Sequence, residues 1–139
     1  MGRILAIDYG SKRCGIAVSD SLRILATGLA NVHSKDLVTF LEDYMKKEVV
    51  DIVVIGEPKT LQNEKSDSAR FIDPFVRHLQ KKFPDLKIDR FDERFTSTMA
   101  HQTMLMSGLK KKDRQNKETV DIISATIILQ DYMNSQSFK

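Results

Sequence analysis

The apolar run Ile-Val-Val-Ile at residues 52–55, which stops abruptly at Gly56-Glu57-Pro58, most strongly constrains the fold. A strand that is apolar on both of its faces is typical of a parallel sheet covered by helices on both sides. We therefore expect residues 52–55 to form a central strand of an α/β sheet, with the Gly-Glu-Pro segment ending it.

Two shorter apolar runs come earlier in the chain, at residues 3–7 and 14–18. They are close enough to form a hairpin with residues 10–13 as its loop. A third strand is expected at residues 23–32, although Gly28 interrupts its pattern. These segments together predict an antiparallel meander at the start of the sheet.

Helical patterns alternate with strand patterns in the rest of the chain. Ser34 is a candidate N-cap for a helix whose apolar residues Leu37, Phe40, Leu41 and Tyr44 have helical spacing. The other predicted elements are a helix at 66–82 after a polar stretch at 59–65, a strand at 87–91, a helix from Ser97 or Thr98 to Gly108, and a helix at 119–132. Pro74 should either kink the second helix or mark its true start. A meander followed by alternating elements predicts a mixed sheet with helices on both faces.

The composition is that of a globular protein of one domain, residues 1–139. Of its 139 residues, 41% are hydrophobic and 29% are charged, and the net charge of +3 permits a polyanionic partner without requiring one. Cys14 is the single cysteine, which excludes an internal disulfide framework. No apolar run approaches the roughly 18 residues that a membrane span needs. We therefore expect a cytoplasmic protein that does not enter a membrane.

Acidic residues follow three of the predicted strands. Asp8 and Glu57 each come after a strand, and the pair Asp92-Glu93 follows another. Ligands of open α/β sheets bind at the carboxyl ends of the strands. Clustered carboxylates repel one another, and a divalent cation such as Mg²⁺ or Mn²⁺ would relieve that repulsion. The pattern predicts a metal site at one edge of the sheet.

Asp121 is a further candidate ligand, expected in the first turn of the last helix. Its face continues through Ser124, Ala125 and Ile128, and the two small residues would let this face approach the sheet closely. The helix dipole also favours an ionised acid near the N-terminus. Each acid alone is equally compatible with a turn or a helix start, so the prediction depends on several acids meeting at one edge.

Three segments resemble the motifs of a known family. Residues 8–20, DYGSKRCGIAVSD, are similar to the opening motif D-x-G-x-x-R-x-G-x-A-x-S-D of the YqgF (RuvX) family, a branch of the RNase H-like superfamily related to Holliday-junction resolvases. Residues 92–97 resemble the motif D-E-R-x-[ST]-[ST], and Lys117 with residues 120–125 resembles K-x-x-x-D-x-x-[SA]-A. The motifs come in the expected order, and the resemblance covers essentially the whole chain.

The resemblance implies an RNase H-like sheet of five strands, with an antiparallel meander of strands 1–3, then parallel strands, and helices on both faces. It also implies a metal-dependent nuclease that processes the 5′ end of the small-subunit ribosomal RNA precursor in bacteria. By motif position, Asp8, Glu93 and Asp121 would hold one or two Mg²⁺ or Mn²⁺ ions, and an activated water would attack the scissile phosphate in line. The implied phosphate-positioning residues are Arg13, Arg94 and Lys117, and Lys110, Lys111 and Lys112 in the basic stretch 110–117 are further candidates for substrate contact, although such a stretch is as readily a solvated loop.

One departure from the family pattern concerns the acids. The family commonly has Gly-Leu-Pro where this chain has Gly56-Glu57-Pro58, so Glu57 is either an additional ligand or a loop acid that faces solvent. Asp92 competes with Glu93, because adjacent residues of a strand face opposite ways and only one of the two should point into the site.

Other functions compatible with the sequence are a resolvase-like nuclease that acts on branched DNA and a non-catalytic RNA-binding module of the same fold. An ATP-binding domain of the actin and sugar-kinase type also begins with D-x-G after a strand, but such enzymes enclose ATP between two domains. A monomer and a weak homodimer both fit the sequence.

Overall fold

The computed structural model describes residues 2–10, 12–57, 69–92 and 117–137. These residues form five strands, a short 3₁₀ turn and three α-helices. In chain order the elements are β1 (Arg3–Tyr9), β2 (Arg13–Ser19), β3 (Ala26–His33), the 3₁₀ turn η1 (Ser34–Asp36), α1 (Leu37–Lys47), β4 (Val50–Glu57), α2 (Ala69–Lys82), β5 (Lys87–Asp92) and α5 (Lys117–Ser137).

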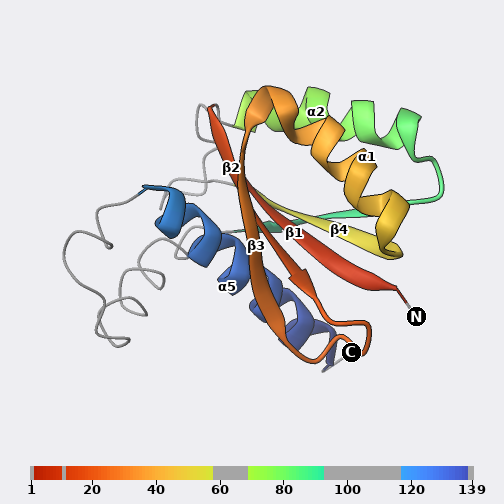
Figure 1. Cartoon of the computed structure of the whole chain (residues 1–139), viewed down its shortest axis with the longest axis vertical. Helices are drawn as coiled ribbons and strands as arrows, with labels where there is room; N and C mark the ends of the chain where they lie inside the picture. Colours follow the sequence, from red (N-terminus) through yellow and green to blue (C-terminus); the bar gives the residue numbers. More distant parts are fainter. Residues whose placement is uncertain (1, 11, 58–68, 93–116, 138–139) are drawn as a thin grey trace.

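The strands form one mixed sheet in the order β3-β2-β1-β4-β5 (Figure 1). β2 is antiparallel to both β1 and β3, whereas β1, β4 and β5 are parallel to one another. This arrangement confirms the expected fold: a meander of three strands followed by parallel strands. Because β1, β4 and β5 are parallel neighbours, Asp8, Glu57 and Asp92 all lie at the same end of the sheet.

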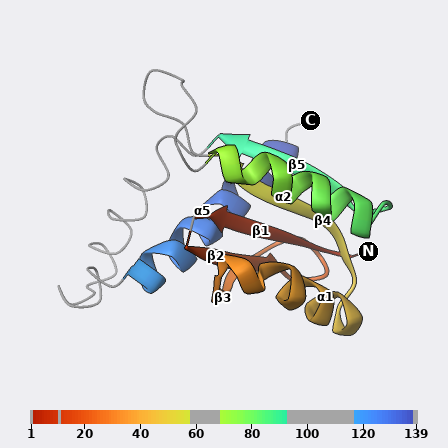
Figure 2. The ribbon, with the colours of Figure 1, turned by 90° about the horizontal axis from the view of Figure 1, so that it is seen from above.

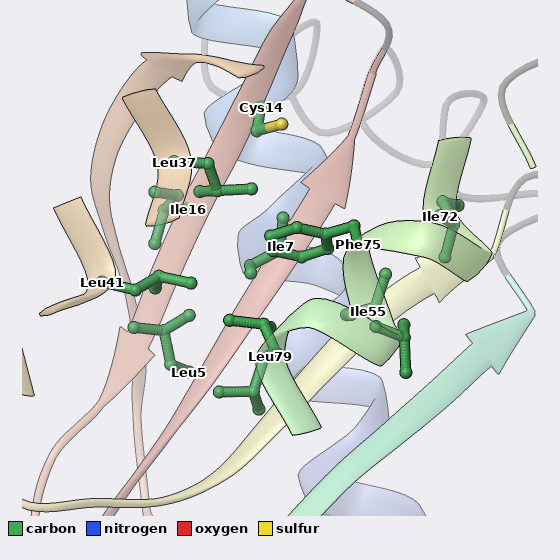
Figure 3. Packing of buried hydrophobic residues seen from close by; sticks show 12 residues of the cluster. Leu5, Ile7, Cys14, Ile16, Leu37, Leu41, Ile55, Ile72, Phe75 and Leu79 are labelled. Atoms are coloured by element: carbon green, nitrogen blue, oxygen red, sulfur yellow. The ribbon is translucent and has the colours of Figure 1, made fainter. Parts of the chain in front are cut away.

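Helices cover both faces of the sheet, as the sequence predicts. α1 and α2 lie on one face and α5 crosses the other (Figure 2). On the first face, side chains from the strands meet those of the two helices in a core that includes Leu5, Ile7, Ile16, Leu41, Ile55 and Leu79 (Figure 3). On the second face, α5 buries Ala125, Ile128 and Leu129 against the sheet. Alternate residues of a strand therefore belong to different cores.

The structure also confirms the prediction for the apolar segment in the middle of the chain. Val53, Val54 and Ile55 are fully buried, and β4 pairs with β1 on one side and with β5 on the other. Val53 and Ile55 contact the α1–α2 core while Val54 contacts the α5 core. Burial on both faces explains why this strand has no polar alternation.

β3 begins at Ala26, three residues later than expected, because a tight turn occupies the start of the predicted segment. The Asp20 carboxylate accepts hydrogen bonds from the amides of Ile24 (2.7 Å) and Leu25 (3.1 Å). Arg23 adopts a φ of 58°, in the left-handed region that such turns require. Gly28 lies inside β3, and the pairing with β2 shifts register between Ile16 and Ala17.

The prediction that Ser34 caps the first helix is wrong. The Ser34 hydroxyl donates to the carbonyl oxygen of Gly10 (2.7 Å) and so ties the helix start to the β1–β2 loop. The cap of the preceding 3₁₀ turn is His33, whose Nδ1 accepts from the amide of Lys35 (3.3 Å). In the next helix Pro74 lies inside α2, so it does not mark the start of that helix.

α5 begins two residues earlier than expected, at Lys117, and ends at Ser137. Asp121 is therefore its fifth residue. The prediction that it lies in the first turn is wrong. The favourable effect of the helix dipole on an acid falls off beyond the first turn, so it contributes little at Asp121. The expected helix ending at Gly108 and the polar stretch 59–65 lie outside the described residues.

Two glycines let α5 approach the sheet closely. A Cβ added to Gly15 would lie 2.0 Å from the carbonyl oxygen of Asp121, and one added to Gly28 would lie 2.5 Å from Cγ2 of Ile122. Gly15 thus faces helix backbone, whereas Gly28 faces a side chain. Within the described ranges, no helix is both long and apolar enough to cross a membrane.

We expect the substitution Gly15→Ala to lower the free energy of unfolding by about 2–3 kcal/mol, because the added methyl group displaces α5 from the sheet. Urea denaturation measures this change. Gly28→Ala is the matched control, and it should cost less because the side chain of Ile122 can move out of the way. A larger loss for Gly28→Ala than for Gly15→Ala would contradict this account of the packing.

Asp20 should make the stability depend on pH. Hydrogen bonds from the Ile24 and Leu25 amides lower the pKa of Asp20 below its ordinary value of 3.8. A carboxylate with a lowered folded-state pKa stabilises the fold above its ordinary pKa, and this contribution is lost as the pH falls through the folded-state value. Asp20→Asn should therefore lower the urea midpoint at neutral pH but not well below pH 3.8. The control Asp43→Asn, at an exposed residue of α1, should leave both midpoints unchanged.

Candidate active site

A row of paired residues crosses the sheet at the end where β1 finishes and β2 starts. Along this row Asp8 pairs with Gly15 on one side and with Gly56 on the other, and Gly15 pairs in turn with Asn31 of β3. Strand alternation puts Asp8 on the same side as Ile4 and Ala6, which belong to the α5 core. The row therefore faces α5, and Asp8 stands in it between two glycines.

Asp121 lies directly over this row. Its carbonyl oxygen is the atom that a Cβ on Gly15 would meet, and its Oδ2 accepts a hydrogen bond from Nδ2 of Asn31 (3.2 Å). Neighbouring strands are about 4.8 Å apart, so Asp8 is one strand away from the glycine beneath Asp121. The fold thus brings Asp8 and Asp121 together from opposite ends of the chain, and both side chains are partly buried.

The electrostatics of Cys14, the neighbour of Gly15 on β2, agree with this arrangement. Burial is the main reason that the pKa of the Cys14 thiol is raised, and the negative charges of Asp8 and Asp121 both raise it further. Carboxylates at the same edge of a sheet repel each other. A cation between or beside them would relieve this repulsion.

Arg13 is the one predicted phosphate-binding residue whose side chain the structure describes. It is the first residue of β2 and precedes Gly15 by two positions, so it lies on the same face of the sheet as Asp8. It is partly buried and pairs with His33 of β3. Arg13 therefore lies on the face of the sheet that carries Asp8 and that α5 covers.

The strand positions of the two additional acids belong to the other face. In β4, position 57 falls on the same side of the strand as Val53 and Ile55, which contact the α1–α2 core. In β5, Asp89 accepts a hydrogen bond from Tyr132 of α5, whereas Arg90 forms an ion pair with Asp73 of α2. Position 92 falls on the same side of the strand as Arg90. The backbone register thus separates positions 57 and 92 from the face on which Asp8 lies.

The remaining predicted site residues are not described by the structure. Glu93 and Arg94 lie outside the described ranges, as do Lys110, Lys111 and Lys112, and only the backbone of Lys117 is described, as the first residue of α5. Among the residues that are described, no group of three or more histidine, cysteine or acidic side chains is arranged to hold a metal ion. The described part of the site thus contains two acids of the predicted three.

The two acids fit a hard divalent cation. Carboxylate oxygens are the ligands that Mg²⁺ and Mn²⁺ prefer, and Mg²⁺ is commonly held by one or two carboxylates together with substrate phosphate. The fit is supported by the packing, because the glycine under Asp121 lets the helix bring its acid close to the strand end that carries Asp8. The residues present are therefore suitable ligands.

Sequence reasoning missed two residues of this region. Gly15 is part of the first motif, and a glycine inside a strand is a signal for close approach of another backbone. Asn31 gives no comparable signal, because its contact with Asp121 joins residues 90 positions apart. Only the packing of α5 across β2 and β3 reveals that contact.

Comparison with known proteins identifies the family. The family model described as "RuvX: Holliday junction resolvase" matches residues 2–135. The chain belongs to the RuvX family. Relatives from Bacteroides thetaiotaomicron and Flavobacterium johnsoniae are each 56% identical to this RuvX chain over 138 residues, covering 99% of it and 100% of the relative. Both relatives carry the name "Putative pre-16S rRNA nuclease".

The fold is also similar to that of a solved structure. The structure described as T. thermophilus RuvC in complex with a Holliday junction substrate has a TM-score of 0.63 to this RuvX chain, and the match covers 100% of this chain and 98% of that one. The two sequences are 12% identical, so the likeness concerns the fold. It agrees with the RNase H-like architecture expected from the sequence.

Proposed function

We propose that this RuvX chain is a nuclease that hydrolyses phosphodiester bonds near the 5′ end of the small-subunit ribosomal RNA precursor, with Asp8, Glu93 and Asp121 as its metal-binding acids. The reaction and substrate follow the names of relatives that are 56% identical over nearly their whole length. The observation that supports this site most directly is the position of Asp121 over Gly15, next to Asp8 in the strand register.

Each residue has a physical role in this proposal. The three acids would hold a Mg²⁺ or Mn²⁺ ion, which would supply Lewis acidity for activating a water and for stabilising charge on the phosphate. Asp8 and Asp121 hold opposite sides of the site, one from the sheet and one from the helix, so the ligands are fixed by rigid elements. Arg13 attracts the phosphate backbone and orients it toward the acids.

The backbone register favours three acids over five. Positions 57 and 92 belong to the face that α1 and α2 cover, whereas Asp8 belongs to the α5 face. In this proposal Glu57 and Asp92 therefore lie outside the ligand set, and Glu93 is the acid contributed by the chain after β5.

Glu57→Gln should accordingly change the cleavage rate by less than about threefold.

Branched DNA is a second candidate substrate. The RuvC structure with the similar fold is described as a complex with a Holliday junction substrate, and the family model bears the description of a Holliday junction resolvase. RNA is favoured because the names of the relatives with high sequence identity refer to pre-16S rRNA. A cleavage assay with both substrates distinguishes these possibilities.

We expect Asp8→Asn and Asp121→Asn each to reduce Mn²⁺-dependent cleavage at least about 100-fold, because each removes an anionic ligand of the activating cation. The assay compares a precursor RNA fragment with a four-way DNA junction, in Mg²⁺ or Mn²⁺. RNA binding, measured without metal, should stay equal or become tighter, because one negative charge near the phosphates is lost.

The control for this assay is Asp43→Asn, which makes the same chemical change at an exposed position of α1. Its cleavage rate should match that of the unmodified protein. Unchanged cleavage by the Asp8→Asn protein would reject the assigned site. ATP affinity without any nuclease activity would instead favour the nucleotide-binding alternative.

A further inference from the structure

Asn31 makes a contact that the proposed reaction does not yet explain. It lies on the edge strand β3, in the register row that contains Gly15 and Asp8, and its amide donates to Oδ2 of Asp121. The side chain is partly buried under α5. Asp121 lies over Gly15, and in the strand register Asn31 is on one side of Gly15 and Asp8 is on the other.

The charges of the two acids make such a contact useful. Asp8 and Asp121 repel each other before a cation binds, and repulsion favours side-chain conformations in which the carboxylates move apart. A hydrogen bond to one carboxylate oxygen restricts these conformations and so reduces the ordering cost of binding a cation. It also stabilises the ionised form that a metal requires.

The chemistry of an amide suits this role better than that of a basic side chain. A lysine or arginine at position 31 would bring a full positive charge beside Asp121 and compete with the cation. The neutral amide of Asn31 orients the carboxylate and leaves its charge in place. Partners that hold metal ligands in this way typically change metal affinity by about 10–100-fold when they are removed.

We infer that Asn31 is a positioning residue for the metal site, which holds the Asp121 carboxylate ready to share a divalent cation with Asp8. This inference rests on the proposed function and adds to it a residue outside the three motifs. It predicts an effect on metal affinity, and little effect on the rate once the metal is saturating.

Calorimetric titration of the purified full chain with Mn²⁺, in the absence of nucleic acid, tests the inference. Asn31→Leu keeps a similar side-chain volume and removes the donor, so Mn²⁺ binding should weaken about tenfold. Cleavage of the precursor RNA fragment should need correspondingly more Mn²⁺ and should recover to within about threefold at saturation. Thr27→Ala, at an exposed position of the same strand, should leave both measurements unchanged.

The outcomes separate this inference from the proposed function. If Asp8→Asn abolishes Mn²⁺ binding while Asn31→Leu binds it as tightly as the unmodified protein, or more tightly, Asn31 has no positioning role and the site itself stands. If the unmodified protein binds no Mn²⁺, the proposed metal site fails and the role of Asn31 fails with it. Thermal unfolding checks that the variants are folded, and Asn31→Ala replaces Asn31→Leu if the larger side chain disrupts the packing of α5.

Discussion

The packing of α5 against β2 is the contact on which the arrangement of the site depends. The helix backbone meets the sheet at Gly15, where no side chain separates Asp121 from the strand. Small or apolar residues on the same helix face, among them Ala125 and Ile128, continue this contact along the sheet. Because the helix is held along its length, the position of Asp121 relative to Asp8 is fixed by the core.

This arrangement concentrates negative charge at one end of the sheet. Asp8 and Asp121 both act on the buried thiol of Cys14, and Arg13 lies on the same face of the sheet as Asp8. Like charges held at one end of a sheet repel each other, so the hydrophobic contacts of the two cores matter for holding this arrangement.

Successive residues of each strand face opposite sides of the sheet, so neighbouring side chains meet different helices. In β1, Asp8 faces α5, whereas the neighbouring Tyr9 packs against Phe75 of α2, with ring centroids 5.1 Å apart. The same alternation assigns positions 57 and 92 to the α1–α2 side. Positions 57 and 92 thus fall on the face opposite to that of Asp8, because a shift of one residue along a strand moves a position to the other face.

The sequence by itself predicted the mixed sheet, the buried strand β4 and the helices on both faces, because these features follow from local apolar patterns. The motif resemblance also indicated the family and selected Asp8 and Asp121. Local patterns, by contrast, placed the N-cap at Ser34 and the start of β3 at residue 23 incorrectly, because the hydrogen bonds from Ser34 to Gly10 and from residues 24 and 25 to Asp20 depend on the geometry of turns.

Tertiary structure alone decided which residues surround the acids. The contact of Asn31 with Asp121 and the fit of Gly15 under the helix both join segments that are far apart in the chain. Apolar periodicity specifies which side of a helix or strand is buried, but it does not specify which residue of another element lies opposite. That pairing depends on the position of α5 along the sheet, and the close contact between Gly15 and the helix backbone fixes this position.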